Sequence, residues 1–429
     1  MTPWLGAAYG AVARTAELLA VVTPRSVSGK VGRTFTARRR IRRRYRVWAE
    51  AGRDRSRQLI WVHAASVGEG LMALPLIQLI RRAQPSVQIA YTYFSPSAES
   101  LADQMGADFS DYLPFDSGSS ARATLEALDP TALVFAKGDV WPTLVREASL
   151  QGVRLALVSA SIPASSLRTS RLGSLLTRDA YGALDAVGAA SGDDAARLVA
   201  AGVREDRVRV TGDTRYDQAW ARGHAETRRC GVVSALASAR PTVVAGSTWR
   251  SDERALLPAW IAVRASVPGA RLIIAPHELS DSHTLSLIEW ARANSLSAAR
   301  LDTATTETDV VVVDRMGVLA DLYAIATIAY VGGGFHAAGL HSLVEPAVFR
   351  APVLVGPQHG GSRDAGLMLA AGGAMSAGGS EQLTRLMTRL LTDERERADR
   401  SDAMGTVVAA ELGAVDRSFE IVRKLLRPV

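Results

Sequence analysis

Short hydrophobic runs alternate with amphipathic stretches along most of the chain. In the first half each run has the length of a strand and is followed by a helical pattern. This alternation is typical of a mostly parallel sheet with helices on both faces. The strands predicted in this half are 59–65, 87–94, 112–116, 132–136, 153–159, 186–190 and 208–211.

The alternation stops in a polar, arginine-bearing stretch from residue 217 to 240 and then begins again. With 429 residues the chain exceeds one ordinary domain. No short repeat is present, so we predict two α/β halves, with a ligand site in a cleft between them. The second half has predicted strands at 242–245, 271–275, 310–313, 328–331 and 353–355, and amphipathic helices at 381–392 and 415–426.

The stretch Leu59–Gly70 is the most informative part of the pattern. A hydrophobic strand breaks at Ser66-Val67-Gly68 and opens a helix that carries Glu69 in its first turn. Such a turn lies at the carboxyl edge of a parallel sheet, where open α/β proteins bind ligands. Glu69 is therefore a candidate catalytic carboxylate, although Ser66 and Glu69 also have the spacing of a capping box.

Other polar residues follow predicted strands in the same way. Asp139 is a second candidate carboxylate, or a helix cap before Trp141-Pro142. The glycine-rich turns at Ser247 and at Gly333-Gly334 could approach phosphate, but neither has the pattern of a dinucleotide-binding turn or a P-loop.

The region that follows the second glycine-rich turn holds a further polar pair. Ser342 and Glu345 are spaced to share one face of a short helix, where they could hold a ribose or phosphate or form another capping box. His277, after a strand end, could contact a nucleotide or be simply solvated.

The charge distribution adds a candidate surface at the N-terminus. The chain carries a net charge of +7, and seven residues from Arg38 to Arg44 read RRRIRRR. This run could meet nucleic acid, anionic lipid or an acidic substrate, or form a solvated helix face. Trp4–Val22 is apolar apart from Arg14 and Glu17, which makes a bilayer crossing costly. It fits a helix in the membrane surface or one packed on the protein.

The cysteine and histidine content argues against a disulfide and against a structural zinc site. A single cysteine, Cys230, rules out an intramolecular disulfide, and the seven histidines lack the short spacings of a structural zinc site.

Taken together, the motifs resemble those of the 3-deoxy-D-manno-octulosonate (Kdo) transferases of lipopolysaccharide synthesis. They run in the family's order through nearly the whole chain. The matching pieces are His63-Ala64-x-Ser66-Val67-Gly68-Glu69, Asp139-x-Trp141-Pro142, Gly212-Asp213-Thr214-Arg215-Tyr216-Asp217, Ala245-Gly246-Ser247-Thr248, Asp314-x-Met316-Gly317-x-Leu319, Tyr330-Val331-Gly332-Gly333-Gly334 and His341-x-x-x-Glu345-Pro346-Ala347.

The resemblance implies an α/β fold of the GT-B type, with two doubly wound Rossmann-like domains facing a cleft. It implies inverting transfer of Kdo from CMP-Kdo to a lipid A precursor (lipid IVA), without a metal or other cofactor. Glu69 would be the general base, and Asp139 and Arg215 would stabilise the transition state. The positions that match the family's CMP contacts are Pro276, His277, Met316, Gly317, Val318, Ser342, Leu343, Val344 and Glu345.

The resemblance also sets the expected organisation and location. We expect a basic membrane-associating segment at 1–50, an acceptor domain at 51–220, a linker at 221–240, a donor domain at 241–412, and a C-terminal helix at 413–429 that packs back on the first domain. The expected location is the cytoplasmic face of the bacterial inner membrane. The expected partners are CMP-Kdo, the lipid A precursor and anionic lipids, and not nucleic acid.

This chain departs from the family pattern at several of these positions. Asp139 replaces a glutamate, Arg215 a lysine, His277 an arginine, Val318 a glutamate and Ser342 an asparagine. The altered donor positions leave open another GT-B transferase that uses a different nucleotide sugar. A non-catalytic protein that binds lipid or nucleic acid through the arginine run is the remaining alternative.

Overall fold

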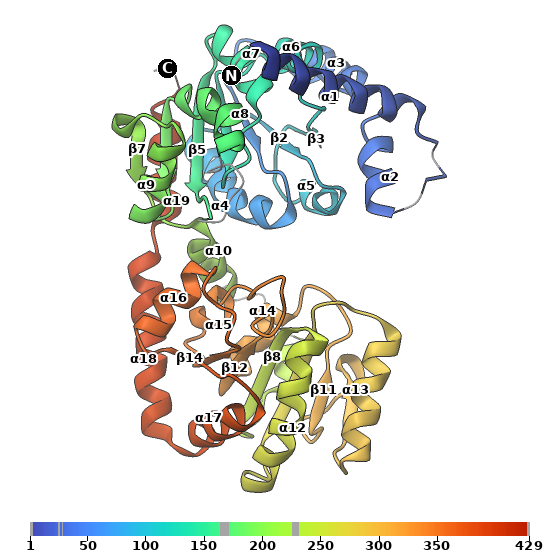
Figure 1. The fold of residues 1–429 in the computed structure, drawn as a ribbon, viewed down its shortest axis with the longest axis vertical. Coiled ribbons are helices and arrows are strands. Elements are labelled where there is room, and N and C mark those ends of the chain that lie inside the picture. Colours follow the sequence, from blue (N-terminus) through green and yellow to red (C-terminus); the bar gives the residue numbers. More distant parts are fainter. Residues whose placement is uncertain (1–2, 25, 28, 164–170, 225–230, 427–429) are drawn as a thin grey trace. The chain divides into compact units, whose positions relative to one another are not determined.

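The computed structural model describes residues 3–24, 26–27, 29–163, 171–224 and 231–426 (Figure 1). The chain forms two compact units. One comprises Met1–Gln218 together with Leu412–Val429, and the other comprises Ala219–Glu411. Cys230 lies outside the described residues.

The first unit is built on a seven-stranded sheet in the order β3-β2-β1-β4-β5-β6-β7, with every pair parallel. The central strands β1 and β4 are wholly buried. This explains their unbroken hydrophobic sequences, since a parallel sheet is covered on both faces. The strands are β1 Leu59–His63, β2 Gln88–Tyr93, β3 Phe109–Tyr112, β4 Ala132–Ala136, β5 Arg154–Ala160, β6 Ala186–Ala189 and β7 Val208–Val210.

The second unit repeats this architecture with strands in the order β10-β11-β9-β8-β12-β13-β14, again all parallel. In each unit the strand order reverses direction at one point: between β1 and β4 in the first sheet and between β8 and β12 in the second. A doubly wound sheet binds its ligand at this topological switch point. The strands are β8 Thr242–Thr248, β9 Arg271–Pro276, β10 Ala298–Arg300, β11 Val310–Val312, β12 Ile328–Val331, β13 Val353–Val355 and β14 Ala374–Ser376.

Helices complete both units. In the first they are α1 Pro3–Val22, α2 Gly29–Thr36, α3 Ile41–Ala51, α4 Val67–Ala83, α5 Glu99–Ala102, α6 Gly118–Leu128, α7 Pro142–Leu150, α8 Arg171–Gly182, α9 Gly192–Ala201 and α19 Ala414–Arg423. Helix α10, Thr214–Gly223, begins in the first unit and ends in the second. The others are α11 Val232–Leu236, α12 Arg250–Ser266, α13 Asp281–Ala293, α14 Leu319–Leu322, α15 Val344–Val348, α16 Arg363–Ala370, α17 Ser380–Thr392 and α18 Glu394–Glu411.

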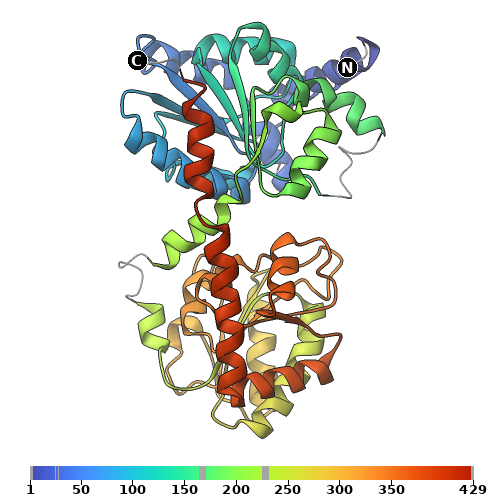
Figure 2. The same ribbon diagram turned by 90° about the vertical axis from the view of Figure 1, so that its left-hand side faces the viewer.

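The chain ends in two successive helices, drawn in red in Figure 2. Helix α18 packs on the second unit against α15, α16 and α17, whereas α19 belongs to the first unit and packs on α4, β5 and β6. Asp217 fixes the start of α19, because its carboxylate accepts the N–H groups of Gly413 at 2.7 Å and Val415 at 3.1 Å.

Most predicted strands are present, and the errors have local causes. The strand predicted at 112–116 is wrong in position, since β3 ends at Tyr112 and Pro114 has no N–H group to pair. The three-residue strands β10 and β14 and the helices α16 and α18 were not predicted. Helix α18 has almost no amphipathic pattern, with only Met404 and Val408 fully buried.

Helix α1 lies along the first unit on one of its faces. Ala13 and Ala20 are buried, and the Tyr9 hydroxyl donates to Asp116 at 2.9 Å. Glu17 accepts from Ser117 and Ser120 and pairs with Arg42 at 3.0 Å. Tyr9 and Glu17 of this apolar helix therefore bind the rest of the unit, whereas Arg14 and Thr15 are exposed and bond only within the helix.

Removal of the Asp217 cap is expected to loosen α19. Asp217→Ala leaves two helix N–H groups without an acceptor, a loss of about 0.5–2 kcal/mol. Amide hydrogen exchange should therefore become several-fold faster in residues 414–423. Asp103→Ala, at an exposed residue of the same unit, is the matched control. Unchanged exchange in α19 of the Asp217 variant would show that the cap does not hold this helix.

Candidate active site

Glu69 lies at the switch point of the first sheet, in the first turn of α4 directly after β1. Its Oε2 accepts the N–H of Ala65 at 2.7 Å, and the Ser66 hydroxyl accepts the N–H of Glu69 at 3.5 Å. The reciprocal capping predicted from the spacing is therefore present, although the carboxylate reaches Ala65 rather than Ser66. Oε1 of Glu69 has no hydrogen bond to any residue that the structure describes.

A neighbouring glycine makes room for this turn. A Cβ atom on Gly70 would lie 2.6 Å from Leu101 and 2.7 Å from the hydroxyl of Tyr91. The buried Tyr91 hydroxyl has no hydrogen-bond partner among the described residues, and burial, with a smaller contribution from Glu69, raises the pKa of Tyr91 above its ordinary range. Tyr91 therefore stays neutral beside the carboxylate.

Asp139 follows β4, the strand adjacent to β1, so both candidate carboxylates flank the same switch point. Nearby, Trp141 donates through Nε1 to Nε2 of the buried His63 at 3.0 Å. His63 Nδ1 lies 2.9 Å from the Thr92 hydroxyl, which also accepts from Trp61. Burial lowers the pKa of His63 to about 3, so this imidazole is neutral and links β1 to the Asp139 loop.

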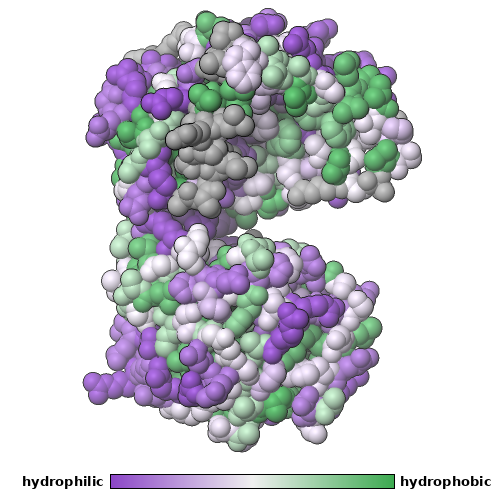
Figure 3. Space-filling view, viewed as in Figure 1, coloured by the Kyte–Doolittle hydropathy of each residue, from purple (hydrophilic) through white to green (hydrophobic). Residues whose placement is uncertain are grey.

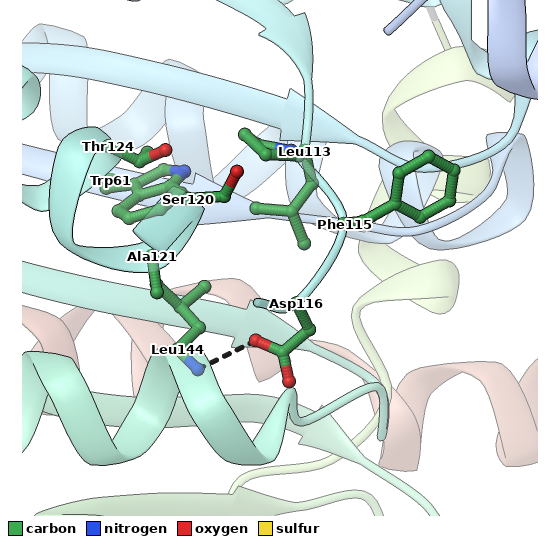
Figure 4. Close-up of a pocket in the computed structure, with 9 residues that line it drawn as sticks. Trp61, Leu113, Phe115, Asp116, Ser120, Ala121, Thr124 and Leu144 are labelled. Atoms are coloured by element: carbon green, nitrogen blue, oxygen red, sulfur yellow. Dashed lines mark hydrogen bonds between the residues drawn. The ribbon is translucent and has the colours of Figure 1, made fainter. Parts of the chain in front are cut away.

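Two residues of this edge did not stand out in the sequence. Asp116 accepts the N–H groups of Thr143 at 2.9 Å and Leu144 at 2.8 Å, and so holds the N-terminus of α7 (Figure 4). The cavity beside it measures only about 10 Å³, so it holds no substrate. Lys137 is exposed and has a left-handed backbone with φ of 67°, a strained conformation that is enriched at functional sites.

The segment Gly212–Asp217 positions the cationic candidate. Asp213 Oδ2 lies 2.8 Å from Nε and 2.7 Å from Nη2 of Arg215, and its Oδ1 accepts the Arg215 N–H at 3.0 Å. The buried Thr214 hydroxyl donates to the carbonyl of Met72 in α4 at 2.8 Å. The Arg215 loop is thus joined to the helix that carries Glu69.

In the second unit the glycine-rich turns fit around a buried carboxylate. Asp252 accepts the N–H groups of Trp249, Gly333 and Phe335 and the hydroxyl of Tyr330, at 2.8–3.1 Å. The N–H of Gly333 is consequently not available to a phosphate. A Cβ on Gly334 would lie 2.4 Å from the backbone of Gly356, so close chain packing explains this glycine.

Ser247 remains a candidate ligand contact at the same edge. Its backbone is left-handed, with φ of 54°, and its hydroxyl bonds to no residue in the described part of the chain. Pro276 ends the neighbouring strand β9 and is buried, whereas His277 directly after it is exposed.

The remaining predicted donor contacts differ in accessibility. Met316 is 78% exposed, and Gly317 accepts at its carbonyl from Arg222 at 2.8 Å. Val318 precedes α14. Leu343 and Val344 are buried, so their side chains belong to the core.

The prediction that Ser342 and Glu345 share one helix face is wrong. Helix α15 begins at Val344, and Ser342 instead donates to Asp364 at 2.8 Å. Burial raises the pKa of Glu345, an effect that the nearby Arg222 opposes.

Two such doubly wound units define the GT-B class of proteins. A UDP-GlcNAc 2-epimerase from Neisseria meningitidis, solved with UDP-GlcNAc, has a TM-score of 0.64 and is 16% identical over 86% of this chain and 100% of its own. An epimerase of this type, described as putative, from Listeria monocytogenes has a TM-score of 0.61 at 12% identity, over 85% of this chain and 97% of its own. At these identities the likeness shows the fold alone.

Sequence comparison identifies the family. Residues 39–218 match the family model described as 3-deoxy-D-manno-octulosonic-acid transferase (kdotransferase). The transferase of that name from Bordetella pertussis is 32% identical over 86% of this chain and 87% of its own length. Its counterpart from Haemophilus influenzae is 24% identical over 91% and 92%. The chain belongs to the Kdo transferase family.

The neutral state of His63 can be tested directly. Because its pKa is about 3, the His63 ring should keep the chemical shifts of neutral imidazole, with Nδ1 protonated, from about pH 8 down to about pH 5. NMR of histidine-labelled protein would follow the signal, assigned by its loss in His63→Gln. A midpoint between about pH 6 and 7 would contradict the buried hydrogen-bonded arrangement.

Proposed function

We propose that this enzyme transfers Kdo from CMP-Kdo to a sugar hydroxyl of a lipid A precursor, with inversion at the anomeric carbon. The observation that carries the proposal is the carboxylate of Glu69, held at the switch point of a chain that belongs to the Kdo transferase family. The donor binds on the second unit, at the edge that holds Ser247 and His277.

The chemistry follows from the two oxygens of Glu69. Oε2 is fixed by the Ala65 N–H, and Oε1 takes the proton of the acceptor hydroxyl. The hydroxyl oxygen then forms a bond to the anomeric carbon of Kdo as the bond from that carbon to the phosphate oxygen breaks. CMP leaves with both electrons of that bond. Attack on the face opposite to CMP produces the inversion.

Charged groups near Glu69 in the first unit would accelerate the proposed reaction further. A general base alone supplies roughly 10²–10⁴-fold, so positioning and charge stabilisation must supply the rest. Arg215 and Asp139 are proposed to stabilise the transition state. The mechanism uses no metal or other cofactor, because the leaving CMP already carries a stable charge.

Glu69→Gln separates catalysis from capping. Glutamine can still accept the Ala65 N–H through its amide oxygen but cannot accept a proton, so the protein should fold and lose at least about 10²-fold in turnover. CMP release from CMP-Kdo in the presence of tetra-acylated lipid A precursor measures that turnover. Ser66→Ala, which weakens the cap and keeps the base, is the matched control and should retain most activity.

Two outcomes would contradict this function. Normal turnover by a folded Glu69→Gln protein would leave Glu69 as a cap alone. Turnover of the wild type with a UDP-sugar, and none with CMP-Kdo, would favour the alternative of a different nucleotide-sugar transferase.

We further propose that the first unit docks on the cytoplasmic face of the inner membrane through α1 and α3. Among the described residues, Trp4–Val22 is the one helix long and apolar enough to span a bilayer, with 11% of it buried. Its exposed face carries Trp4, Val12, Leu18 and Val22. Figure 3 draws apolar surface over the part of this unit where α1 and α2 lie.

Some arginines of the run bind the protein, and others are available to the proposed membrane. Arg38 donates to the carbonyls of Leu113 and Phe94, and Arg44 pairs with Asp111 at 2.7 Å. By contrast, the side chains of Arg39, Arg40, Arg43 and Arg46 pair with no residue in the described ranges. These four side chains can meet anionic head groups while the apolar face of α1 enters the interface.

Charge on the exposed face of α1 should prevent docking. The double variant Val12→Glu with Leu18→Glu is expected to lose most binding to vesicles that contain anionic lipid, because it places two carboxylates in the interface. Co-sedimentation with vesicles measures the bound fraction. Leu285→Glu, at an exposed leucine of α13 in the second unit, is the control. Equal binding of the double variant and the wild type would contradict this orientation.

A further inference from the structure

Lys137 follows the central strand β4 at the edge of the first sheet that holds Glu69. The ladder between β1 and β4 ends at the pair His63 and Phe135, and two positions further along these strands lie Ala65 and Lys137. The N–H of Ala65 holds the Glu69 carboxylate. Because neighbouring strands are only about 4.8 Å apart, the backbone of Lys137 lies close to the turn that carries the proposed base.

The backbone of Lys137 is held in a conformation that few side chains tolerate. Its φ is 67°, and Gly138 donates its N–H to the carbonyl of Ala136 at 3.0 Å, so Lys137 is the central residue of a three-residue turn. Strand β5 and the residue after it fix this turn, since the Lys137 N–H donates to Val158 at 2.9 Å and its carbonyl accepts from Ser161 at 3.0 Å. Such turns with a positive φ are rare and strained, and glycine fits them best. Backbone geometry alone would thus favour glycine at this position.

The side chain of Lys137 does not repay this strain through contacts in the described part of the chain. It is exposed, and its ammonium group pairs with no residue that the structure describes. Arg215, the other cationic candidate of this unit, is already bound by Asp213 through two nitrogens. Glu69 and Asp139 bring negative charge to the same edge, and that charge would repel an anionic substrate. A strained residue whose charge has no protein partner points to a ligand.

We propose that Lys137 binds the phosphate of the acceptor, a phosphorylated glycolipid, and so determines affinity for it beside Glu69. The assignment to the acceptor rests on the proposed function, in which the donor binds on the second unit. A lysine ammonium is a compact point charge that suits a phosphate. It also offsets the two carboxylates of this edge. Lys137 thus selects the acceptor and does not contact the donor.

The kinetic test follows CMP release while acceptor and donor concentrations are varied separately. Lys137→Gln should raise the KM for the tetra-acylated precursor about tenfold or more, because a hydrogen bond between charged groups is lost, and leave the KM for CMP-Kdo unchanged. Lys137→Arg should restore most of the affinity. Lys137→Gly should lose as much affinity as Lys137→Gln, yet melt at no lower a temperature than wild type, because it relieves the turn. With a dephosphorylated precursor, wild type and Lys137→Gln should have equal KM values.

Lysine acetylation tests the contact without catalysis. Lys424, an exposed lysine of the same unit, is the matched control. When the full chain reacts with acetic anhydride, the phosphorylated precursor should slow modification of Lys137 several-fold, whereas the dephosphorylated precursor and CMP should not. Lys424 should react equally in every case. Mass spectrometry of the peptides measures both sites.

The outcomes separate this inference from the proposed function. Normal Kdo transfer without protection of Lys137 would overturn the phosphate contact and leave the proposed function intact. A higher KM for CMP-Kdo in Lys137→Gln, with the acceptor KM unchanged, would also overturn it. Protection of Lys137 by the phosphorylated precursor alone, in a protein that transfers no Kdo, would support the contact and reject the proposed reaction.

Discussion

The hydrogen bond from the Ala65 N–H to the Glu69 carboxylate is the contact on which the first unit's proposed site depends. It fixes one oxygen of a side chain that would otherwise rotate freely, and it leaves the other oxygen without a partner in the part of the chain that the structure describes. Two neighbours support the contact: β1, which is wholly buried, and Gly70, whose missing side chain makes room for Leu101 and Tyr91. The turn therefore holds the carboxylate in place where the proposed reaction needs a positioned base.

The number of oxygens in use distinguishes Glu69 from Asp116 and Asp252, two other buried carboxylates of this protein. Both oxygens of Asp116 accept backbone N–H groups of α7, and both oxygens of Asp252 accept two donors each. These carboxylates hold loops and helix ends together, and neither has an oxygen left for a substrate proton. Glu69 has the same kind of backbone bond on one oxygen only. Structural capping and catalysis are thus compatible in a single side chain.

The fold was predictable because its strands are buried on both faces. The runs at β4, β12 and β13 were placed to the residue, since short hydrophobic sequences between turn signals are typical of covered parallel strands. The three-residue edge strands β10 and β14 and the long helix α18 have weak patterns and were missed. Glu69 and Asp139 were predictable as residues that follow adjacent central strands.

Tertiary contacts that leave no local signal explain what the sequence could not predict. Asp364 binds the hydroxyl of Ser342 from 22 positions away, and so Ser342 lies outside α15. His336, His341 and Trp249 are distant from His277 in the chain, and only the loop packing brings their rings together. The occupied N–H of Gly333 likewise depends on Asp252, on a helix 81 positions earlier.

A mass spectrum of the lipid product tests the central claim most directly. The purified protein would be incubated with CMP-Kdo and tetra-acylated lipid A precursor, and the lipid extracted. The account predicts a gain in mass of one or more Kdo residues on the precursor, and no such gain with the Glu69→Gln protein. An unmodified precursor after incubation with active, folded wild-type protein would contradict it.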